Sequence, residues 1–277
     1  MYVFTAIILL TGIIIIYFLI PFSPVKNEFN KMLSAQIQKE SKSTDVFTLH
    51  DIEKLPKPVK KYFEYCKLTG KRKMTYSKII FKNAAFLMSP GKPYTKIDFT
   101  ECYFVREPVR IVFIDTKMFG IPFQGIDSYI NGKGGMKGVF AKAITLFNQT
   151  GPEMDIGCLV TVLSACLVSP NIALQDYIVW EEIDDRKAKA TISYYGISAS
   201  GIFNFAETGE MTSFTTNDRW EIEPNGKKRQ IPWSLKPCDY AEKDGIMQAS
   251  RFRVMWHYGN EESVYFDGKN TIIEHFR

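Results

Sequence analysis

The stretch MDIGCLVTVLSACLV, residues 154–168, decides which folds the sequence can adopt. Its apolar side chains repeat at helical spacing, and Leu159, Leu163 and Leu167 lie on one stripe of the predicted helix. A helix that is apolar on most sides has to be buried or to cover an apolar surface. Pro170 is expected to end this helix. The chain on either side of the helix must therefore supply the apolar surface that buries it.

The segments on both sides of this helix have the period of two that is typical of β-strands. Strands are predicted over residues 76–81, 94–104, 109–115, 124–130, 136–141, 177–180, 188–195, 201–205, 211–216, 228–233, 246–256, 263–266 and 271–276. Asn131-Gly132 predicts a tight hairpin, because a type I′ turn needs positive φ at both central residues. We therefore predict a mainly β (α+β) fold: a strongly curved antiparallel sheet or half-open barrel of about eleven strands, with a few helices as a lid.

The N-terminus predicts a transmembrane anchor over residues 1–21. Residues 1–20 contain no charged side chain, and about 20 apolar helical residues suffice to cross a bilayer core. A cleaved signal peptide is the alternative, but no basic residue precedes the apolar run. Lys26, Lys31 and Lys39 follow it, and this charge bias favours a cytoplasmic position for the rest of the chain.

The remaining chain divides into a polar linker, residues 22–47, and a single β-rich ligand-binding domain, residues 48–277. Thr48 and Asp51 have the spacing of a capping box at the start of the domain. Pro58 suits the first turn of a second helix.

Charge and cysteine content argue against several classes of protein. The formal net charge is +5, and acidic and basic residues are interleaved, so we predict no face for nucleic acid. The five cysteines form no C-x-x-C pair and the three histidines lack metal-ligand spacing, so we expect no metal and no cofactor. The glycine-rich segment 132–138 lacks the spacing of a phosphate loop, and no G-x-S-x-G sequence occurs. We predict no catalytic residues from these patterns.

Four blocks of sequence carry a resemblance to a known family. They are LPKPVKKYF at 55–63, GPEMDIG at 151–157, WEEIDD at 180–185, and Pro232-Trp233 followed by Asp239-Tyr240. In this order they resemble an uncharacterised family of bacterial proteins of unknown function, many of which carry N-terminal membrane segments. That family often has an acidic residue and a Trp-Phe-Pro-like run where this chain has SACLVSP, so any chemical role of that carboxylate is not carried over.

The order of the predicted elements also resembles the lipoprotein-carrier superfamily. In that fold about eleven antiparallel strands form a half-open barrel, with helices as a lid over an apolar cavity. The resemblance implies binding of acyl chains or another apolar ligand. It also implies an extracytoplasmic domain, against the charge bias, so the side of the cell membrane stays undecided.

The function predicted from these observations is membrane-anchored binding of a lipid or other apolar ligand in the cavity of the curved sheet, without catalysis. Aromatic residues make up 14% of the chain, and a wide concave face must be filled or lined. The candidate ligand-binding residues are Leu159, Leu163, Leu167, Phe205, Trp233 and Trp256. The expected partners are a membrane lipid or acyl chain and, through residues 1–20, the bilayer.

Two alternatives stay open. One is an enzyme of unknown class whose polar residues are Asp239 and Tyr240. The other is an interaction scaffold with a packed core and no cavity. A deep apolar cavity favours the binder, whereas convergent carboxylates in a polar cleft favour the enzyme.

Overall fold

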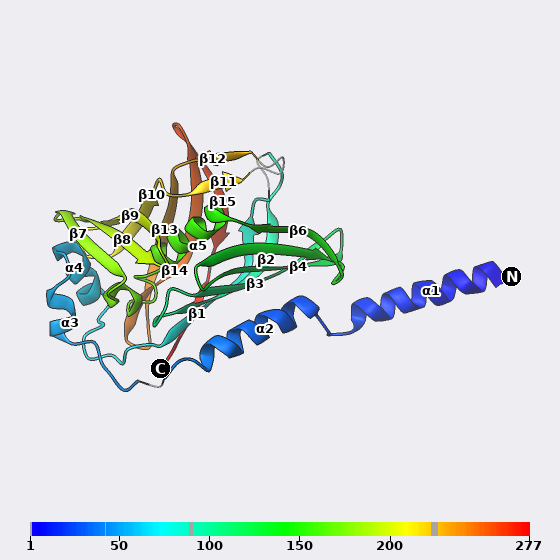
Figure 1. Cartoon of the computed structure of the whole chain (residues 1–277), viewed down its shortest axis with the longest axis horizontal. Coiled ribbons are helices and arrows are strands. Elements are labelled where there is room, and N and C mark those ends of the chain that lie inside the picture. The colour runs from blue at the N-terminus through cyan, green and yellow to red at the C-terminus, as the bar shows by residue number, and fades with distance from the viewer. Residues whose placement is uncertain (1, 42, 89–90, 223–226) are drawn as a thin grey trace.

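A computed structural model describes residues 2–41, 43–88, 91–222 and 227–277 (Figure 1). The helices are α1 (Tyr2–Leu19), α2 (Pro24–Ile37), α3 (Leu49–Glu53), α4 (Lys57–Tyr65) and α5 (Pro152–Ser164), with a 3₁₀ turn at Ile172–Leu174. The strands are β1 (Tyr76–Phe86), β2 (Thr95–Phe104), β3 (Arg110–Met118), β4 (Ile121–Ile130), β5 (Lys133–Phe140), β6 (Ile144–Thr150), β7 (Ile178–Asp184), β8 (Lys187–Tyr194), β9 (Ile197–Phe205), β10 (Met211–Thr216), β11 (Trp220–Ile222), β12 (Lys228–Gln230), β13 (Trp233–Lys243), β14 (Ile246–Tyr258), β15 (Glu261–Gly268) and β16 (Ile272–Phe276).

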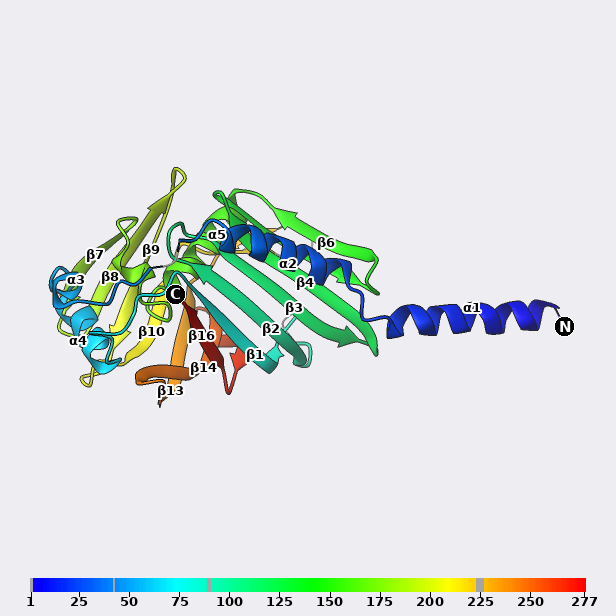
Figure 2. The same cartoon turned by 90° about the horizontal axis from the view of Figure 1, so that it is seen from below.

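Fourteen of the strands form one antiparallel sheet. Its order is β6-β5-β4-β3-β2-β1-β15-β14-β13-β10-β9-β8-β7, with β16 paired to β1, while β11 and β12 form a separate two-stranded sheet. The sheet curves strongly and does not close, because β6 and β7 remain as its two edges (Figures 1 and 2). The mainly β, curved antiparallel fold is therefore confirmed.

The predicted number of about eleven strands is wrong, since the described residues contain sixteen, fourteen of them in the main sheet. The edge strand β6 was missed because its side chains do not alternate between buried and exposed: five of its seven residues are exposed and the other two are half-buried. A half-exposed edge strand carries no period-two pattern. The three-residue strand β11 and the long strand β13 were also missed, whereas β12 lies within the strand predicted over residues 228–233.

Helix α5 joins the two edges of the sheet. The chain leaves β6 at Thr150, passes through α5, and enters β7 at Ile178. The helix lies within the curve of the sheet and contacts strands from both halves, including β5 and β9 (Figure 1). It ends at Ser164 and not at Pro170 as predicted, because the next turns tighten: Ala165 N donates to both the Thr161 and Val162 carbonyls.

The glycine-rich strand β5 is where α5 docks. A Cβ atom on Gly134 would lie 2.4 Å from the carbonyl oxygen of Met154. The buried carboxylate of Asp155 accepts a hydrogen bond from Gly134 N at 2.7 Å. It also forms an ion pair with Lys133 at 3.1 Å. Gly134 therefore permits the close packing of α5 on β5.

Local sequence signals in other places are confirmed. Asn131 and Gly132 join β4 to β5 with φ angles of 52° and 75°, as a type I′ turn requires. Thr48 and Asp51 form the predicted capping box. Pro58 lies in the first turn of α4.

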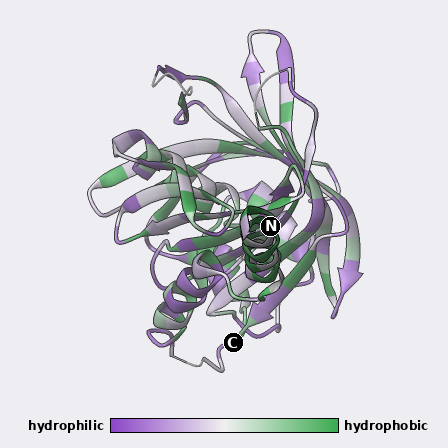
Figure 3. Ribbon diagram, turned by 90° about the vertical axis from the view of Figure 1, so that its right-hand side faces the viewer, coloured by the Kyte–Doolittle hydropathy of each residue, from purple (hydrophilic) through white to green (hydrophobic). Residues whose placement is uncertain are grey.

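The N-terminal helices lie outside the curve. Residues 22–47, predicted as a linker, contain α2, whose Val25 and Phe29 are buried on the convex face of β3 and β4 (Figure 2). Helix α1 projects away from the sheet (Figures 1 and 2), and the chain near the N-terminus is strongly hydrophobic (Figure 3). Within the described residues, no helix reaches the combined length and hydropathy required for a membrane span.

The docking of α5 on β5 gives a first testable prediction. Gly134→Ala should lower the free energy of unfolding by about 1–3 kcal/mol, because the added methyl group meets backbone and the helix must shift. Gly135→Ala is the matched control, since its Cβ would lie 3.4 Å from the nearest atom, a Thr150 methyl group. Urea unfolding followed by tryptophan fluorescence measures both; equal losses would contradict the proposed close contact.

Candidate functional site

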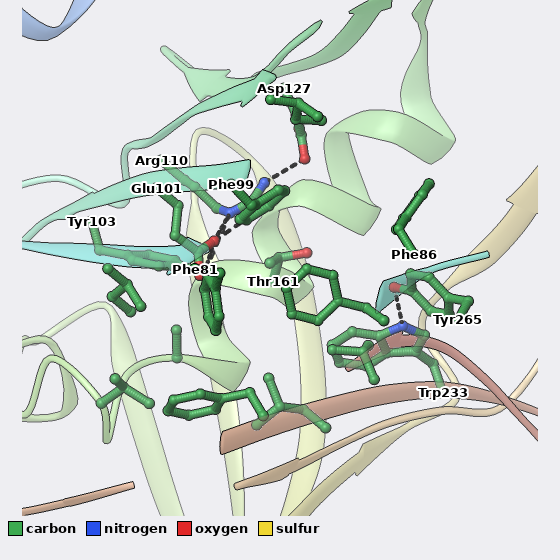
Figure 4. Close-up of a pocket in the computed structure, with 18 of the residues that line it drawn as sticks. Phe81, Phe86, Phe99, Glu101, Tyr103, Arg110, Asp127, Thr161, Trp233 and Tyr265 are labelled. Carbon is green, nitrogen blue, oxygen red and sulfur yellow. Dashed lines mark hydrogen bonds and ion pairs between the residues drawn. The ribbon is translucent and has the colours of Figure 1, made fainter. Parts of the chain in front are cut away.

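A buried chamber lies between α5 and the concave face of the sheet. Its volume is about 170 Å³, and most of its lining is apolar or aromatic (Figure 4). The lining residues are Ile79, Phe81, Phe86, Phe99, Glu101, Tyr103, Arg110, Ile114, Asp127, Met136, Thr161, Ala165, Val168, Arg219, Trp233, Leu235, Phe252, Val254, Tyr265 and Phe266. We call this the inner chamber.

An outer chamber of about 280 Å³ adjoins it beneath β11. The two share six lining residues: Phe86, Asp127, Met136, Thr161, Arg219 and Tyr265. The outer chamber is more polar, and its lining includes the exposed side chain of Met88. The two chambers therefore form one hollow that is buried at the sheet and reaches the surface near β11.

The periodicities of the elements place these side chains. Phe99, Glu101 and Tyr103 alternate along β2, so all three point to the concave face. Thr161 of α5, its C-cap residue Ala165 and Val168 just beyond the helix follow helical spacing along the side that faces the chamber.

A charged cluster forms one wall of the inner chamber (Figure 4). The guanidinium of Arg110 donates from Nε to Glu101 at 3.1 Å and from Nη1 to Asp127 at 2.6 Å. Tyr103 donates its hydroxyl hydrogen to the same Glu101 oxygen at 2.8 Å. Arg110 and Glu101 have side-chain exposures of only 5% and 10%, so the cluster is almost removed from water.

Strand register explains why these residues meet. Glu101 on β2 and Asp127 on β4 both pair with Val112 on β3, so the three lie in one row. Arg110 lies two residues before Val112 and therefore on the same face. From this diagonal position a long side chain reaches both carboxylates.

Burial controls the ionisation of this cluster. Burial raises the pKa of the Glu101 carboxyl above its usual value, although Arg110 opposes the shift. Burial alone would lower the pKa of Arg110, but the attraction of Asp127 and the other cluster members raises it well above its usual range. Arg110 therefore stays charged and is held by the two acidic side chains.

A second guanidinium, that of Arg219, lies where the two chambers join. Its Nη1 donates to Gly157 O at 3.1 Å and to the Thr161 hydroxyl at 2.6 Å. Its Cζ atom lies 4.6 Å from the centroid of a Trp233 ring and 5.8 Å from that of Trp256. Cation–π contacts of this kind hold the guanidinium plane in place.

The six candidate ligand-binding residues lie in different parts of the core. Trp233 lines the inner chamber, and its indole N–H donates to Tyr265 at 2.9 Å (Figure 4). Trp256 lines the outer chamber. Leu167 lines a separate small cavity of about 20 Å³. Leu159, Leu163 and Phe205 are buried in the main core and line neither chamber.

Asp239 and Tyr240, the residues of the enzyme alternative, do not converge in a cleft. Asp239 is exposed at an irregular position of β13 with a φ of 55°, and its carbonyl accepts a hydrogen bond from Ser250. The Tyr240 hydroxyl donates to the carbonyl of Met211 at 3.0 Å. Neither side chain lines the inner or the outer chamber.

Two serine–histidine pairs exist away from the chambers. Ser77 lies 2.8 Å from His275, whose pKa burial lowers to about 4, and Ser234 lies 2.8 Å from His257. Ser77 and Ser234 both have 0% exposure, so neither hydroxyl reaches solvent in this structure. These pairs satisfy buried polar groups of the sheet.

The charged cluster and Arg219 were not predicted from the sequence. A signal was present in the strands, because Glu101, Arg110 and Asp127 occupy inward-facing positions on three consecutive strands. A charged residue at an inward position is rare without a partner or a function. Arg219 gave no such signal, since it precedes a three-residue strand that has no readable period.

Fold and site together define a class: a half-open β-barrel protein with a helix across its concave face and a largely apolar chamber beneath that helix. The chain belongs to a family of unknown function, DUF6544, whose sequence profile matches residues 45–268. The predicted resemblance to an uncharacterised family is thus confirmed.

Comparison with solved structures and curated proteins adds four findings. A LolA superfamily protein from Nitrosomonas europaea is 10% identical with a TM-score of 0.39, over 84% of this chain and 94% of that chain. A putative outer membrane lipoprotein-sorting protein domain from Vibrio parahaemolyticus is 9% identical, with a TM-score of 0.37, over 73% and 84%. A DUF1329 family protein from Desulfovibrio piger is 12% identical, with a TM-score of 0.34, over 79% and 93%. No curated protein matches the chain.

The charged cluster gives a second prediction. Arg110→Met should lower the free energy of unfolding by about 3–5 kcal/mol, because two buried carboxylates lose their cation. Lys67→Met is the control: its ion pair with Glu242 has side chains that are 57% and 50% exposed, so the loss should stay below about 1 kcal/mol. Urea denaturation compares the two, and a loss in Arg110→Met as small as that of the control would show that the cluster is not desolvated.

Proposed function

We propose that the protein binds an acyl chain or another apolar molecule in the inner chamber and holds it without chemical change. One observation carries the proposal: the concave face of the sheet does not pack fully against α5 but leaves a buried, mainly apolar hollow. An interaction scaffold with a filled core has no need for such a hollow. Each buried CH₂ group contributes about 0.8 kcal/mol, so a short hydrocarbon segment suffices for binding.

The size of the hollow supports a single chain as ligand. Small-molecule sites typically have volumes of about 300–1,000 Å³. The inner chamber of about 170 Å³ is below this range, and the adjoining outer chamber adds about 280 Å³. A molecule with one hydrocarbon chain fits this space better than a diacyl lipid.

We further propose that α1 attaches the protein to a membrane. No charged residue occurs in residues 1–20, and apolar side chains such as Ile8 and Ile16 are exposed along α1. Lys142 in the turn before β6 donates to the Ile20 carbonyl at 2.7 Å and so links the end of this helix to the sheet. This contact supports a fixed position of the sheet beside the membrane.

Exposed apolar residues at the same end support this attachment. Phe119, at the tip between β3 and β4, is 95% exposed with a φ of 54°. This backbone conformation is unfavourable for a bulky residue. Ile144 and Leu146 on β6 are also more than half exposed. An aromatic tip beside an apolar helix suits the interface between water and lipid.

The ligand proposal is tested with the full chain in phosphatidylcholine nanodiscs and a diazirine-bearing dodecanol. After irradiation, mass spectrometry should find the label on peptides that contain Phe81, Phe99 or Val168. Ala165→Phe fills the chamber from the α5 side and should lower this labelling about tenfold, as expected when two CH₂ groups lose their site. Ala35→Phe, the same change on the exposed side of α2, should leave it unchanged. Labelling only of α1 and surface residues would refute the proposal.

The attachment proposal is tested by flotation with phosphatidylcholine vesicles. The full chain should float with the vesicles at high salt, because the association is apolar and salt screens only charges. A variant that lacks residues 2–20 should remain in the dense fraction. Equal flotation of the two proteins would show that α1 is not the attachment.

A further inference from the structure

We propose that the ligand carries an anionic group, a carboxylate or a phosphate, which binds Arg219. The inference rests on the proposed function, because it names the head group of the same ligand. The hydrocarbon chain lies in the inner chamber, and the anionic group lies where this chamber meets the more polar outer one.

The charges around the outer chamber point to Arg219. Glu153 forms an ion pair with Lys228 at 2.9 Å, and Glu221 forms one with Arg229 at 2.8 Å. Within each of these two pairs the positive and the negative charge cancel. Within the described residues, Arg219 forms no ion pair with a carboxylate.

The acidic residues of the inner chamber are already occupied. One oxygen of Asp127 accepts from Arg110 at 2.6 Å, and the other faces the Cys158 thiol at 3.7 Å. Glu101 is likewise held by Arg110 at 3.1 Å. Arg110 therefore cannot bind a ligand without giving up its own partners, whereas Arg219 can.

The guanidinium of Arg219 is prepared for an anion. Two hydrogen bonds to α5, at Gly157 and Thr161, use only its Nη1 atom, and its Cζ atom lies within cation–π distance of Trp233 and Trp256. In the described part of the chain, Nε and Nη2 make no hydrogen bond to protein. This Nε/Nη2 edge is the fork that binds carboxylate or phosphate with two parallel hydrogen bonds. Because the side chain is already ordered, little conformational freedom is lost on binding.

The test compares three diazirine probes of equal chain length on the full chain in phosphatidylcholine nanodiscs: dodecanol, dodecanoate and dodecyl phosphate. The probe concentration that gives half-maximal labelling of the chamber is compared between Arg219→Gln and the unmodified protein. For the preferred anionic probe, this concentration should be at least about tenfold higher in Arg219→Gln. This fold-change corresponds to about 1.4 kcal/mol. Dodecanol should change less than about twofold. The anionic probe that shows the larger loss identifies carboxylate or phosphate as the head group.

Two further variants separate contact from other causes. Arg229→Gln removes a positive charge from the neighbouring strand β12, where Glu221 is the partner of Arg229. This variant should still prefer an anionic probe. Arg219→Lys keeps the positive charge but lacks the two-pronged Nε/Nη2 edge, so it should keep only part of the preference for an anionic probe. Equal losses for all three probes in Arg219→Gln would mean a purely structural role, and no preference for an anion in the unmodified protein would also overturn the inference. If dodecanol itself fails to label the chamber, the result contradicts the proposed function, and not only the proposal that the ligand has an anionic head group.

Discussion

The passage of the chain from one edge of the sheet to the other constrains the whole structure. Strands β6 and β7 are consecutive in the sequence but lie at opposite edges, so the segment between them must cross the opening of the curve. That segment contains α5, an apolar helix, and burying it in the concave space removes its surface from water. The contact between Gly134 and Met154 fixes how close the helix comes to β5. The inner chamber is the space that remains between this fixed helix and the opposite strands.

Signals between residues close in sequence were sufficient to predict individual elements. The hairpin at Asn131-Gly132 followed from the φ angles that its turn requires, and the existence of α5 followed from its apolar period. The sequence did not predict which side of α5 faces the chamber. A helix that is apolar on most sides gives no preferred direction, so the leucine stripe of Leu159 and Leu163 was predicted at the ligand, whereas Thr161 and Ala165 line the hollow.

The order of the strands and the charged cluster depend on long-range pairing. Strand β16 pairs with β1, and the paired residues Tyr76 and Phe276 lie far apart in the sequence, so no local pattern specifies that contact. In the cluster, Glu101, Arg110 and Asp127 come together only when β2, β3 and β4 have their observed register. A slip of one residue would turn a charged side chain to the opposite face, which α2 and a second apolar core cover. Leaving a charge unpaired in that core is costly, so the cluster stabilises one register over its neighbours.

The two guanidiniums of the cavity differ in what they can do. Arg110 is surrounded by acidic partners, so its charge is used in holding three strands together. Arg219 is held by a carbonyl, a hydroxyl and two indole rings, none of which neutralises its charge. A buried or half-buried cation without a counter-ion costs free energy that folding alone does not recover. An anionic ligand would recover it, and this is why the same residue that a packed scaffold would avoid is well placed in the proposed binding protein.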